Sequence, residues 1–464
     1  MNNSNTGISR RRFLAATGLA LAAPTIIPSS ALGANGKASP SERVTLGVVG
    51  WGMQGPSNTE AFLAINDCQV VAACDLDKNH LEAAVNKING KYGNKDCAAY
   101  KDFRELMARK DIDAVMLAVP DTWHALTAVE AARNKKDIYG EKPLARTIAE
   151  QQAIVKAIQQ HKRIWQTGSW QRSQAPFRKA AEIVRNGLIG KVTRVEVGLP
   201  EGHYDFAGTS REALQKMGKS GEKPEYLSKV VPGTSDWNAL VSAPPPELDY
   251  ETWVGPSQME PYIKAHVHMN WRWNYNVGGG QLLDWIGHHC DIAHWGLDCD
   301  QTGGPIEIEG TGEFPPKEAV WNTCTKYRIT CKYPNDVTMI IAGGHPDIKG
   351  GAKWIGTDGW VWVDRGHFDA SNIDWFQNPE DKYKVQLYRS DNHQKNFIDC
   401  VKSRKPTITP VETAHHSAIP GHLGLIAMLV GRKIHWNSSK QVIVGDPEAS
   451  KLMRRSYRST WKLT

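Results

Sequence analysis

Asp284 and His288 stand four residues apart in a segment with helical periodicity that runs from Gln281 to about Leu297. Side chains at this spacing project from the same face of a helix. A carboxylate that orients an imidazole is the usual arrangement of a general base. The three glycines that end at Gly280 would let a substrate or a cofactor ring come close. The same residues also fit a structural role, with an acid near the helix N-terminus and a buried, hydrogen-bonded histidine.

A glycine-rich turn near the start of the chain indicates where a cofactor would bind. An apolar run begins at Val44 and ends in G-x-G-x-x-G, formed by Gly50, Gly52 and Gly55, and a helical pattern follows at once. These glycines permit a tight turn, the approach of a pyrophosphate and close packing of helix on strand. The N–H groups at the helix N-terminus then face the negative charge. The motif alone is weak, and a plain β–α–β turn is the alternative.

Asp75 strengthens the dinucleotide interpretation because it closes the next apolar strand, Val70 to Cys74. An acid at this position accepts hydrogen bonds from the ribose hydroxyls of the adenosine half. A carboxylate there favours NAD over NADP, whose 2′-phosphate it would repel. Lys78 nearby leaves some room for NADP.

Strand and helix patterns alternate along the chain up to Gly168, and these elements would position the glycine turn and Asp75. This alternation predicts a doubly wound parallel sheet with ligands beyond the carboxyl ends of its strands. The loop 120–124, with His124, and the strand exit at Lys142 fall at that edge. After Gly168 we expect helices at 175–186, 281–297, 392–403 and 413–432, and strands at 191–197, 323–333, 338–342 and 354–364. Their spacing indicates a mostly antiparallel sheet, so the predicted fold class is α/β with two different sheets.

The N-terminus reads as an export signal that is removed. Arg10, Arg11 and Arg12 precede a short apolar run and a zone of small residues, as in twin-arginine leaders. The run is too short for a membrane span, and a basic N-terminal tail is the alternative. Twin-arginine export carries folded proteins, which fits a periplasmic protein with a tightly bound cofactor. The expected parts are a leader (1–33), a linker (34–42), a nucleotide-binding domain (43–168) and a substrate-binding and oligomerisation domain (169–464).

Composition excludes several classes of protein. The net charge of +7 includes the three leader arginines, and the rest of the chain has no basic run that would indicate nucleic-acid binding. The eight cysteines show no C-x-x-C or zinc-finger spacing. Folding before export argues against an extensive disulfide framework, although a single pair stays open.

Taken together, the motifs resemble the glucose–fructose oxidoreductase/inositol dehydrogenase (Gfo/Idh/MocA) family over about residues 42–460. The resemblance is carried by the glycine turn, Asp75, Glu141-Lys142-Pro143 and the segment Gly278 to Asp291. The stretch 396–404 is similar to the exported subgroup with twin-arginine leaders. The resemblance implies a Rossmann domain followed by an α/β domain whose large open sheet forms homo-oligomers, a dimer or tetramer. It also implies a nicotinamide cofactor and a sugar or cyclitol substrate.

By this resemblance Lys142, Asp284 and His288 are the catalytic residues: Lys142 lies beside the nicotinamide and the substrate hydroxyl, Asp284 orients, and His288 moves the proton. A cation beside the oxygen stabilises the developing alkoxide. The expected cofactor-binding residues are Gly50, Trp51, Gly52, Met53, Gln54, Asp75, Pro120, His124, Glu141 and Lys142. The expected substrate-binding residues are Lys142, Trp271, Arg272, Tyr275, Asp284 and His288.

Two features depart from the simplest members of the family. Trp51 is bulky for a glycine turn and could form a wall of the cofactor site. The insertion segment, residues 200–275, contains His203, Tyr204, Asp205, His266 and His268, and its part 200–256 shows little periodicity. This segment could build the substrate pocket, so the resemblance to the family does not identify the substrate of this protein. Trp271, Trp273 and Tyr275 could stack on a sugar, or pack in a core.

Four functions remain in view. The leading one is an exported NAD-dependent sugar oxidoreductase, and the second is an NAD-dependent glycosidase with transient oxidation, elimination, water addition and re-reduction. The third is a metal site formed by His266, His268, His288, His289 and His294, although His288 and His294 do not share a helical face well. The fourth is a binding protein that retains the nucleotide as a structural part. We predict no metal site.

Overall fold

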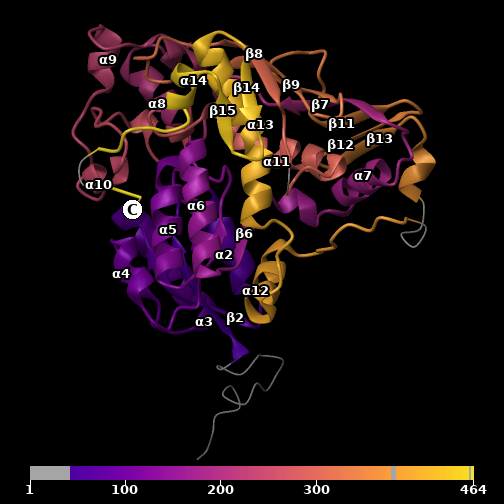
Figure 1. The fold of residues 1–464 in the computed structure, drawn as a ribbon. Helices are drawn as coiled ribbons and strands as arrows, with labels where there is room; N and C mark the ends of the chain where they lie inside the picture. The colour runs from indigo at the N-terminus through magenta and orange to yellow at the C-terminus, as the bar shows by residue number, and fades with distance from the viewer. Residues whose placement is uncertain (1–41, 302, 378–382, 459–460, 464) are drawn as a thin grey trace, which may run out of the picture. The chain divides into compact units, whose positions relative to one another are not determined.

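The computed structural model describes residues 42–301, 303–377, 383–458 and 461–463. Residues 44–464 form one compact unit, drawn in Figure 1. The expected leader and all but the last residue of the expected linker lie outside the described residues. Within the described part, no helix is both long and apolar enough to cross a membrane.

The first sheet has six parallel strands in the order β3-β2-β1-β4-β5-β6. This is the doubly wound order, which reverses between β1 and β4 and opens a crevice there. The predicted parallel sheet is confirmed. Its strands are β1 (Val44–Val49), β2 (Cys68–Cys74), β3 (Ala98–Tyr100), β4 (Ala114–Leu117), β5 (Asp137–Gly140) and β6 (Trp165–Thr167).

Helices cover both faces of this sheet, each over its own hydrophobic cluster. One face carries α4 (Phe103–Ala108), α5 (Asp121–Arg133) and α6 (Ile148–His161), and the other carries α2 (Gln54–Leu63), α3 (Lys78–Tyr92) and α12 (His393–Ser403). The helix α12 belongs to the end of the chain, yet its Phe397 packs edge-on against Phe62 and Tyr139. The C-terminal part of the sequence therefore completes the core of the N-terminal sheet.

The second sheet has nine strands in the order β13-β12-β11-β7-β10-β9-β8-β14-β15. All neighbours are antiparallel except β7 and β10, so the predicted mostly antiparallel sheet is confirmed. Its strands are β7 (Val192–Leu199), β8 (Glu307–Glu313), β9 (Lys326–Lys332), β10 (Thr338–Gly343), β11 (Gly351–Gly356), β12 (Trp360–Asp364), β13 (His367–Ala370), β14 (Ile434–Asn437) and β15 (Val442–Val444).

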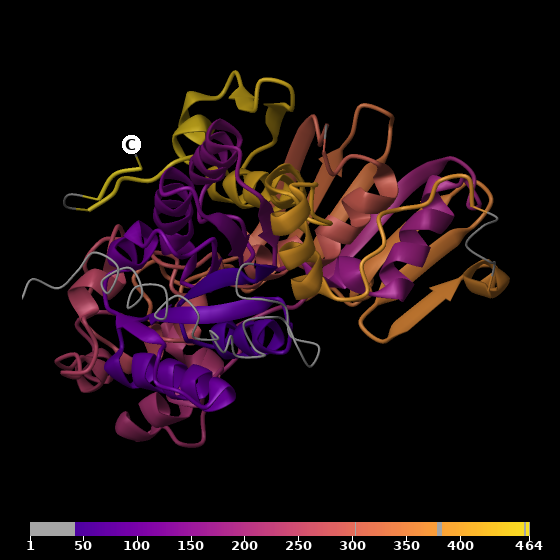
Figure 2. The ribbon, with the colours of Figure 1, turned by 90° about the horizontal axis from the view of Figure 1, so that it is seen from below.

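One hydrophobic cluster joins this sheet to α7 (Ala175–Arg185), α11 (Gly280–Leu297) and α13 (Val411–Val430). Seen from two directions, α13 runs between the two sheets (Figures 1 and 2). The short elements η3 (Trp170–Ser173), η7 (Ile373–Gln377) and α14 (Pro447–Lys451) complete this part. The helix α11, which carries Asp284 and His288, is therefore anchored along its length in the larger core.

Two features of this half differ from expectation. The stretch 354–364 is two strands, β11 and β12, because the chain turns back where Gly356 N–H donates to the carbonyl of Gly359 at 2.8 Å. The strands β8, β13, β14 and β15 were not expected. Each of them pairs with partners distant in sequence or lies at an edge of the sheet, where the apolar alternation is weak.

The insertion segment is not irregular. It contains α8 (Thr209–Lys216), η4 (Pro224–Lys229), α9 (Ser235–Leu240), α10 (Tyr250–Val254), η5 (Lys264–His266) and η6 (Asn270–Trp273). Two small hydrophobic clusters hold these short helices together. Trp273 is fully buried in one of them, and therefore packs in a core. His203 lies in the same region, where burial lowers its pKa to about 4.

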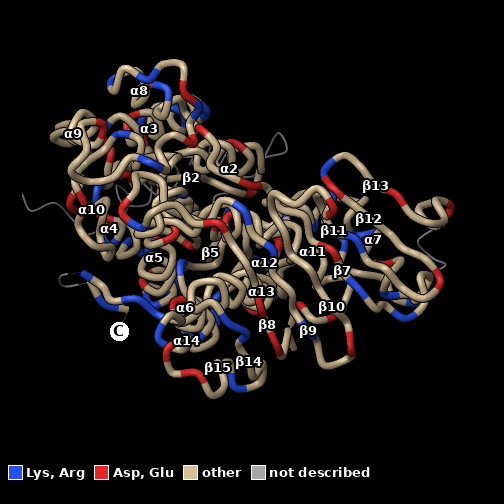
Figure 3. The backbone as a smooth tube through the Cα atoms, turned by 90° about the horizontal axis from the view of Figure 1, so that it is seen from above, with Lys and Arg blue, Asp and Glu red and all other residues tan. Residues whose placement is uncertain are grey.

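Charged residues of both signs are interspersed along the backbone in Figure 3. Basic segments (blue) alternate with acidic segments (red) over both halves of the view. This distribution agrees with the absence of a basic run in the sequence of the described part.

Candidate active site

The glycine turn after β1 has the geometry of an anion cradle. Gly50 has φ +92°, and a Cβ there would lie 2.3 Å from the carbonyl oxygen of Ala118. A Cβ at Gly55 would lie 2.1 Å from the carbonyl oxygen of Gly50, whereas a Cβ at Gly52 would meet nothing within 4 Å. The helix α2 starts at Gln54 without a side-chain cap. Its first N–H groups are thus available to an anion, and the open side of Gly52 leaves space for one.

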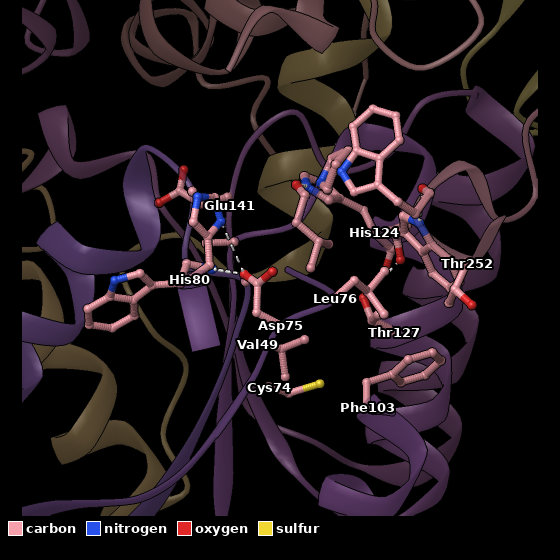
Figure 4. Close-up of a pocket in the computed structure, with 18 of the residues that line it drawn as sticks. Val49, Cys74, Asp75, Leu76, His80, Phe103, His124, Thr127, Glu141 and Thr252 are labelled. Atoms are coloured by element: carbon pink, nitrogen blue, oxygen red, sulfur yellow. Dashed lines mark hydrogen bonds and ion pairs between the residues drawn. The ribbon is translucent and has the colours of Figure 1, made fainter. Parts of the chain in front are cut away.

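A cavity of about 300 Å³ extends from this turn across the carboxyl ends of β1, β2, β4 and β5. Figure 4 shows part of its lining, with Asp75 and His80 joined by a dashed line. All the residues expected to bind the cofactor line this cavity: Gly50, Trp51, Gly52, Met53, Gln54, Asp75, Pro120, His124, Glu141 and Lys142. The glycine turn and the acid at the next strand end together fit a nicotinamide dinucleotide.

Asp75 is held by backbone groups on both sides. Its Oδ2 accepts from Trp51 N–H at 2.7 Å and its Oδ1 accepts from Asp77 N–H at 2.9 Å. The nearby His80 has its pKa raised, chiefly because it interacts with the Asp75 carboxylate. Trp51 is buried and lines the cavity, as the sequence suggested. A carboxylate at this strand end can accept hydrogen bonds from the hydroxyls of a ribose.

At the other end, Lys142 meets α11. Its Nζ donates to the backbone carbonyl of Asp284 at 2.9 Å and to Oδ1 of the same residue at 3.1 Å, and Arg272 Nε donates to that Oδ1 at 3.0 Å. A Cβ at Gly287 would lie 2.9 Å from the Cβ of Lys142, so this glycine permits the close approach. Burial alone would raise the pKa of Asp284, but Lys142 and Arg272 outweigh it and hold the pKa below its usual range.

His288 differs from expectation, because its imidazole makes no hydrogen bond with Asp284. The carboxylate instead faces two cations, which attract it more strongly than a neutral imidazole does. The ring of His288 is buried, and its Nδ1 has no partner. Burial first, and then the charges of Lys142 and Arg365, hold its pKa well below the usual range. The ring is therefore neutral in this environment, and the low pKa makes it a weaker proton acceptor than a free imidazole.

Glu141 and His124 fix the strand exits. Glu141 Oε1 accepts from Asn58 Nδ2 at 2.7 Å, and burial raises the pKa of this carboxyl. The structure places His124 in the first turn of α5 rather than in a loop. Its two ring nitrogens lie 2.7 Å from the carbonyl oxygen of Pro143 and 2.9 Å from that of Val119. His124 therefore links the segment that follows β4 to the segment that follows β5, and Lys142 lies in the latter segment.

The two aromatic residues expected to bind substrate, Trp271 and Tyr275, lie on different cavities. Trp271 lines the cavity, and the Arg272 guanidinium lies 4.5 Å from its ring centroid. Tyr275 lies instead on a second cavity of about 380 Å³, where the guanidinium of Arg146 lies 4.3 Å from its ring centroid. Although Tyr275 is close to Trp271 in sequence, it does not line the cavity that holds Lys142.

Several residues of the site were missed from the sequence. Asp121 is buried, and burial raises the pKa of its carboxyl, which interacts electrostatically with Asp284. The guanidinium of Arg365, at the end of β12, lies between the rings of Trp170 and Trp285. Trp253 of the insertion segment and Trp461 near the chain end line the cavity. Asp121 directly follows Pro120 at a helix start, and this local pattern could have identified it from the sequence. No local pattern marks Arg365, Trp253 or Trp461.

The histidines considered for a metal site do not converge. His266 Nε2 faces the carbonyl of Val320, His289 Nδ1 faces that of Gly198, and His294 Nε2 faces the hydroxyl of Tyr333. Among the described residues, the potential ligand group of three is a different one: Asp77, His80 and His268.

Two family models match the chain, the NAD-binding Rossmann fold of an oxidoreductase family over residues 44–169 and the C-terminal α/β domain of the same family over residues 234–463. The chain belongs to the Gfo/Idh/MocA oxidoreductase family. It is 32% identical to inositol 2-dehydrogenase of Salmonella typhimurium over 147 residues, which are 31% of this chain and 42% of the relative. It is 33% identical to glycosyl hydrolase family 109 protein 1 of Shewanella sp. strain MR-4 over 163 residues, 31% of this chain and 35% of that one. The chain thus matches less than half the length of these relatives.

Solved structures share the fold of both halves. The WlbA dehydrogenase of Bordetella pertussis, solved with NADH and UDP-GlcNAcA, matches with TM-score 0.59 and 14% identity over 85% of this chain and 99% of its own. The aldose–aldose oxidoreductase of Caulobacter crescentus matches with TM-score 0.58 and 16% identity over 85% and 99%. At these identities the likeness establishes a common fold.

Proposed function

We propose that this protein is an NAD-dependent oxidoreductase that acts on a hydroxyl or keto carbon of a sugar, cyclitol or glycoside. The single observation that carries the proposal is the contact of Lys142 with Asp284 at one end of a cavity whose other end is a dinucleotide cradle. Family membership and the inositol dehydrogenases among the relatives support the class of substrate.

Different residues of the chain would bind the cofactor, stabilise charge and move the proton. The turn at Gly50–Gly55 and the N-terminus of α2 would hold the pyrophosphate, and Asp75 the ribose. Bound NAD supplies the carbon that accepts or gives back a hydride. The ammonium of Lys142 faces the substrate oxygen and stabilises negative charge there as the hydroxyl proton leaves. The unprotonated imidazole of His288 takes that proton. Asp284 positions Lys142 rather than His288.

Further parts of the proposal rest on single features. Asp75 would disfavour the 2′-phosphate of NADP, which makes NAD the cofactor. The arginine-rich leader would direct the folded protein to the periplasm, and the second sheet would form a homo-oligomer. Retention of the cofactor after export would rely on the insertion segment. This segment reaches the cavity through Trp253, whose backbone carbonyl accepts from Trp123 Nε1 at 2.9 Å.

A redox-neutral glycosidase is the second candidate, favoured by the glycosyl hydrolase family 109 relatives at 30–33% identity. In that reaction the substrate carbon is oxidised, the neighbouring C–H is deprotonated, the aglycone leaves, water adds and the carbon is reduced again. Hydride returns to the sugar, so no reducing equivalent accumulates. The same Lys142 and His288 would serve, because the first step is the same oxidation.

One assay separates the two candidates. Purified protein is incubated with NAD and a panel of inositols, aldoses and aryl glycosides, and both NADH and released aglycone are measured. Net NADH with the glycosidic bond intact supports the oxidoreductase, and aglycone release without net NADH supports the glycosidase. Lys142→Met should reduce either rate by at least about 100-fold, since charge stabilisation of this kind contributes 10²–10³-fold. Near-normal turnover in that variant would refute the role of Lys142.

A further inference from the structure

Asp77, His80 and His268 form a cluster beside the cavity that the proposed reaction does not use. Asp77 is the N-cap of α3 and His80 lies in its first turn, whereas His268 comes from the insertion segment. One potential ligand atom from each lies within 4.8 Å of the others. The three side chains therefore come from two segments that are 188 residues apart in sequence and lie side by side in the fold.

Two contacts of the cluster are longer than direct hydrogen bonds. Inside the cluster, His268 Nε2 lies 3.4 Å from Asp77 Oδ2. At its edge, His80 Nδ1 lies 3.8 Å from Oδ2 of Asp75, which is not one of the three residues. A direct N–H···O bond would bring these atoms to about 2.7–3.2 Å. Two ligand atoms at about 2.0–2.1 Å from one tetrahedral ion are roughly 3.3 Å apart. The spacing of His268 and Asp77 thus matches a shared ion better than a bond between the two.

The atoms that would bind an ion are available. Asp77 uses Oδ1 to cap the helix, accepting from Asn79 N–H at 2.8 Å and from His80 N–H at 3.3 Å, which leaves Oδ2 for a ligand. Asp75 beside His80 is the kind of carboxylate that commonly orients a metal-bound imidazole.

The backbone at His268 indicates that its position is imposed. Its φ is +60°, in the left-handed region that residues other than glycine seldom adopt. In this conformation its ring lies 4.5 Å, centroid to centroid, from the ring of His80. Strained conformations of this type persist where the surrounding structure holds them, often at functional sites.

We propose that Asp77, His80 and His268 bind one divalent transition-metal ion of the Zn²⁺ class. A mixed imidazole and carboxylate set suits such ions. The ion would fasten the insertion segment to the nucleotide-binding domain, where a backbone link already exists: Lys78 N–H donates to the carbonyl of Glu247 at 3.0 Å. Because His80 and His268 also line the cavity, this fastening would close the adenosine end of the cofactor site.

Metal binding can be measured without turnover. Tag-free protein, with any bound nucleotide left in place, is treated with a chelator, dialysed and titrated with Zn²⁺ or Co²⁺ alone. We expect one ion per chain, Co²⁺ absorption bands of nitrogen and oxygen ligation without thiolate charge transfer, and a higher Tm with Zn²⁺. Binding should weaken as the pH falls, since protons compete for the imidazoles.

Two conservative variants keep the experiment decisive. Asp77→Asn keeps a good helix cap, and His268→Asn tolerates the left-handed backbone. Each should lower Zn²⁺ affinity by more than about 100-fold, because even the partners of metal ligands contribute 10–100-fold. His367→Ala removes an exposed imidazole on β13 and should change nothing. Absence of stoichiometric binding to the wild type, or unchanged binding in both variants, would overturn the proposal whether or not the protein is an oxidoreductase.

Discussion

Replacing Asp284 with Asn tests whether its carboxylate is the shared counter-ion of Lys142 and Arg272. The amide has nearly the same shape and keeps an oxygen that can accept from both cations. The substitution removes only the negative charge. The cationic side chains are 12% and 10% exposed, so water cannot easily replace the lost carboxylate.

The expected magnitude follows from distance and burial. At the 3.1 Å separation of Lys142 Nζ and Asp284 Oδ1, Coulomb's law at an effective dielectric constant of 20 gives about 5 kcal/mol of attraction. Desolvation offsets part of this attraction, and breaking a buried pair typically costs about 3–5 kcal/mol. Because the amide oxygen retains both hydrogen bonds, we expect Asp284→Asn to lower the free energy of unfolding by about 3 kcal/mol.

The assay is urea unfolding followed by circular dichroism, with an exposed ion pair as the control. Lys87 Nζ and Glu60 Oε1 are also 3.1 Å apart, but their side chains are 49% and 70% exposed. Glu60→Gln should therefore change the free energy of unfolding by about 0.5 kcal/mol or less. Lys142→Met should cost less than Asp284→Asn, because the carboxylate keeps Arg272. An Asp284→Asn variant as stable as Glu60→Gln would refute this electrostatic account.

Three further predictions concern the cradle, the proton acceptor and acid stability. Gly52→Ala should weaken nucleotide binding about 10-fold without lowering Tm. Gly55→Ala, whose Cβ would lie 2.1 Å from a carbonyl oxygen, should lower the free energy of unfolding by about 1–3 kcal/mol. Equal losses of Tm in the two variants would contradict this prediction. Arg365→Gln removes a charge that lowers the pKa of His288, so the acid limb of the kcat/KM profile should move to higher pH; an unmoved limb would count against His288. Buried histidines with folded pKa below 6.5 stabilise the fold above pH 6.5, and this contribution is lost as the pH falls toward 4, at about 1.4 kcal/mol per pH unit each. Urea unfolding should thus show a steep loss between pH 6.5 and 5, and a flat profile would be contrary to the expectation. Burial lowers the pKa to about 4 in His203, His393 and His415, and to about 3 in His294 and His422.

The nucleotide cradle could be predicted from the sequence because its signals are local. A glycine turn between a strand and a helix, and an acid at the next strand exit, each depend on a few consecutive residues. The doubly wound order then brings Gly50, Asp75 and Lys142 to one sheet edge by topology alone. The structure places all three on the same cavity.

Side-chain pairing could not be predicted in the same way. Helical spacing correctly put Asp284 and His288 on one helix, but the partner of the carboxylate is decided by Lys142 and Arg272, which reach it from other segments. Arg365 lies in the turn between β12 and β13, and β13 was not expected from the sequence. Tyr275 follows Trp271 closely in sequence, yet the chain turns between them and sends its ring to another cavity.

The insertion segment shows the limit of periodicity. Its α-helices are short, from α10 with five residues to α8 with eight, so a 3.6-residue pattern has hardly two turns in which to appear. Its stability comes from aromatic clusters that join distant parts of the segment. Such clusters are visible only once the chain has folded.

The central claim, that Lys142 and His288 act on a substrate carbon beside bound NAD, is tested most directly by single-turnover absorbance of the nicotinamide. Purified protein loaded with NAD is mixed rapidly with sugars, inositols and glycosides while the near-ultraviolet absorbance of reduced nicotinamide is followed. The account predicts a transient or lasting rise with at least one substrate, whether the reaction is net oxidation or redox-neutral cleavage, and a rise at least about 100-fold slower in Lys142→Met. A rise of equal rate in wild type and Lys142→Met, or no rise although the protein cleaves or converts the substrate, would contradict it.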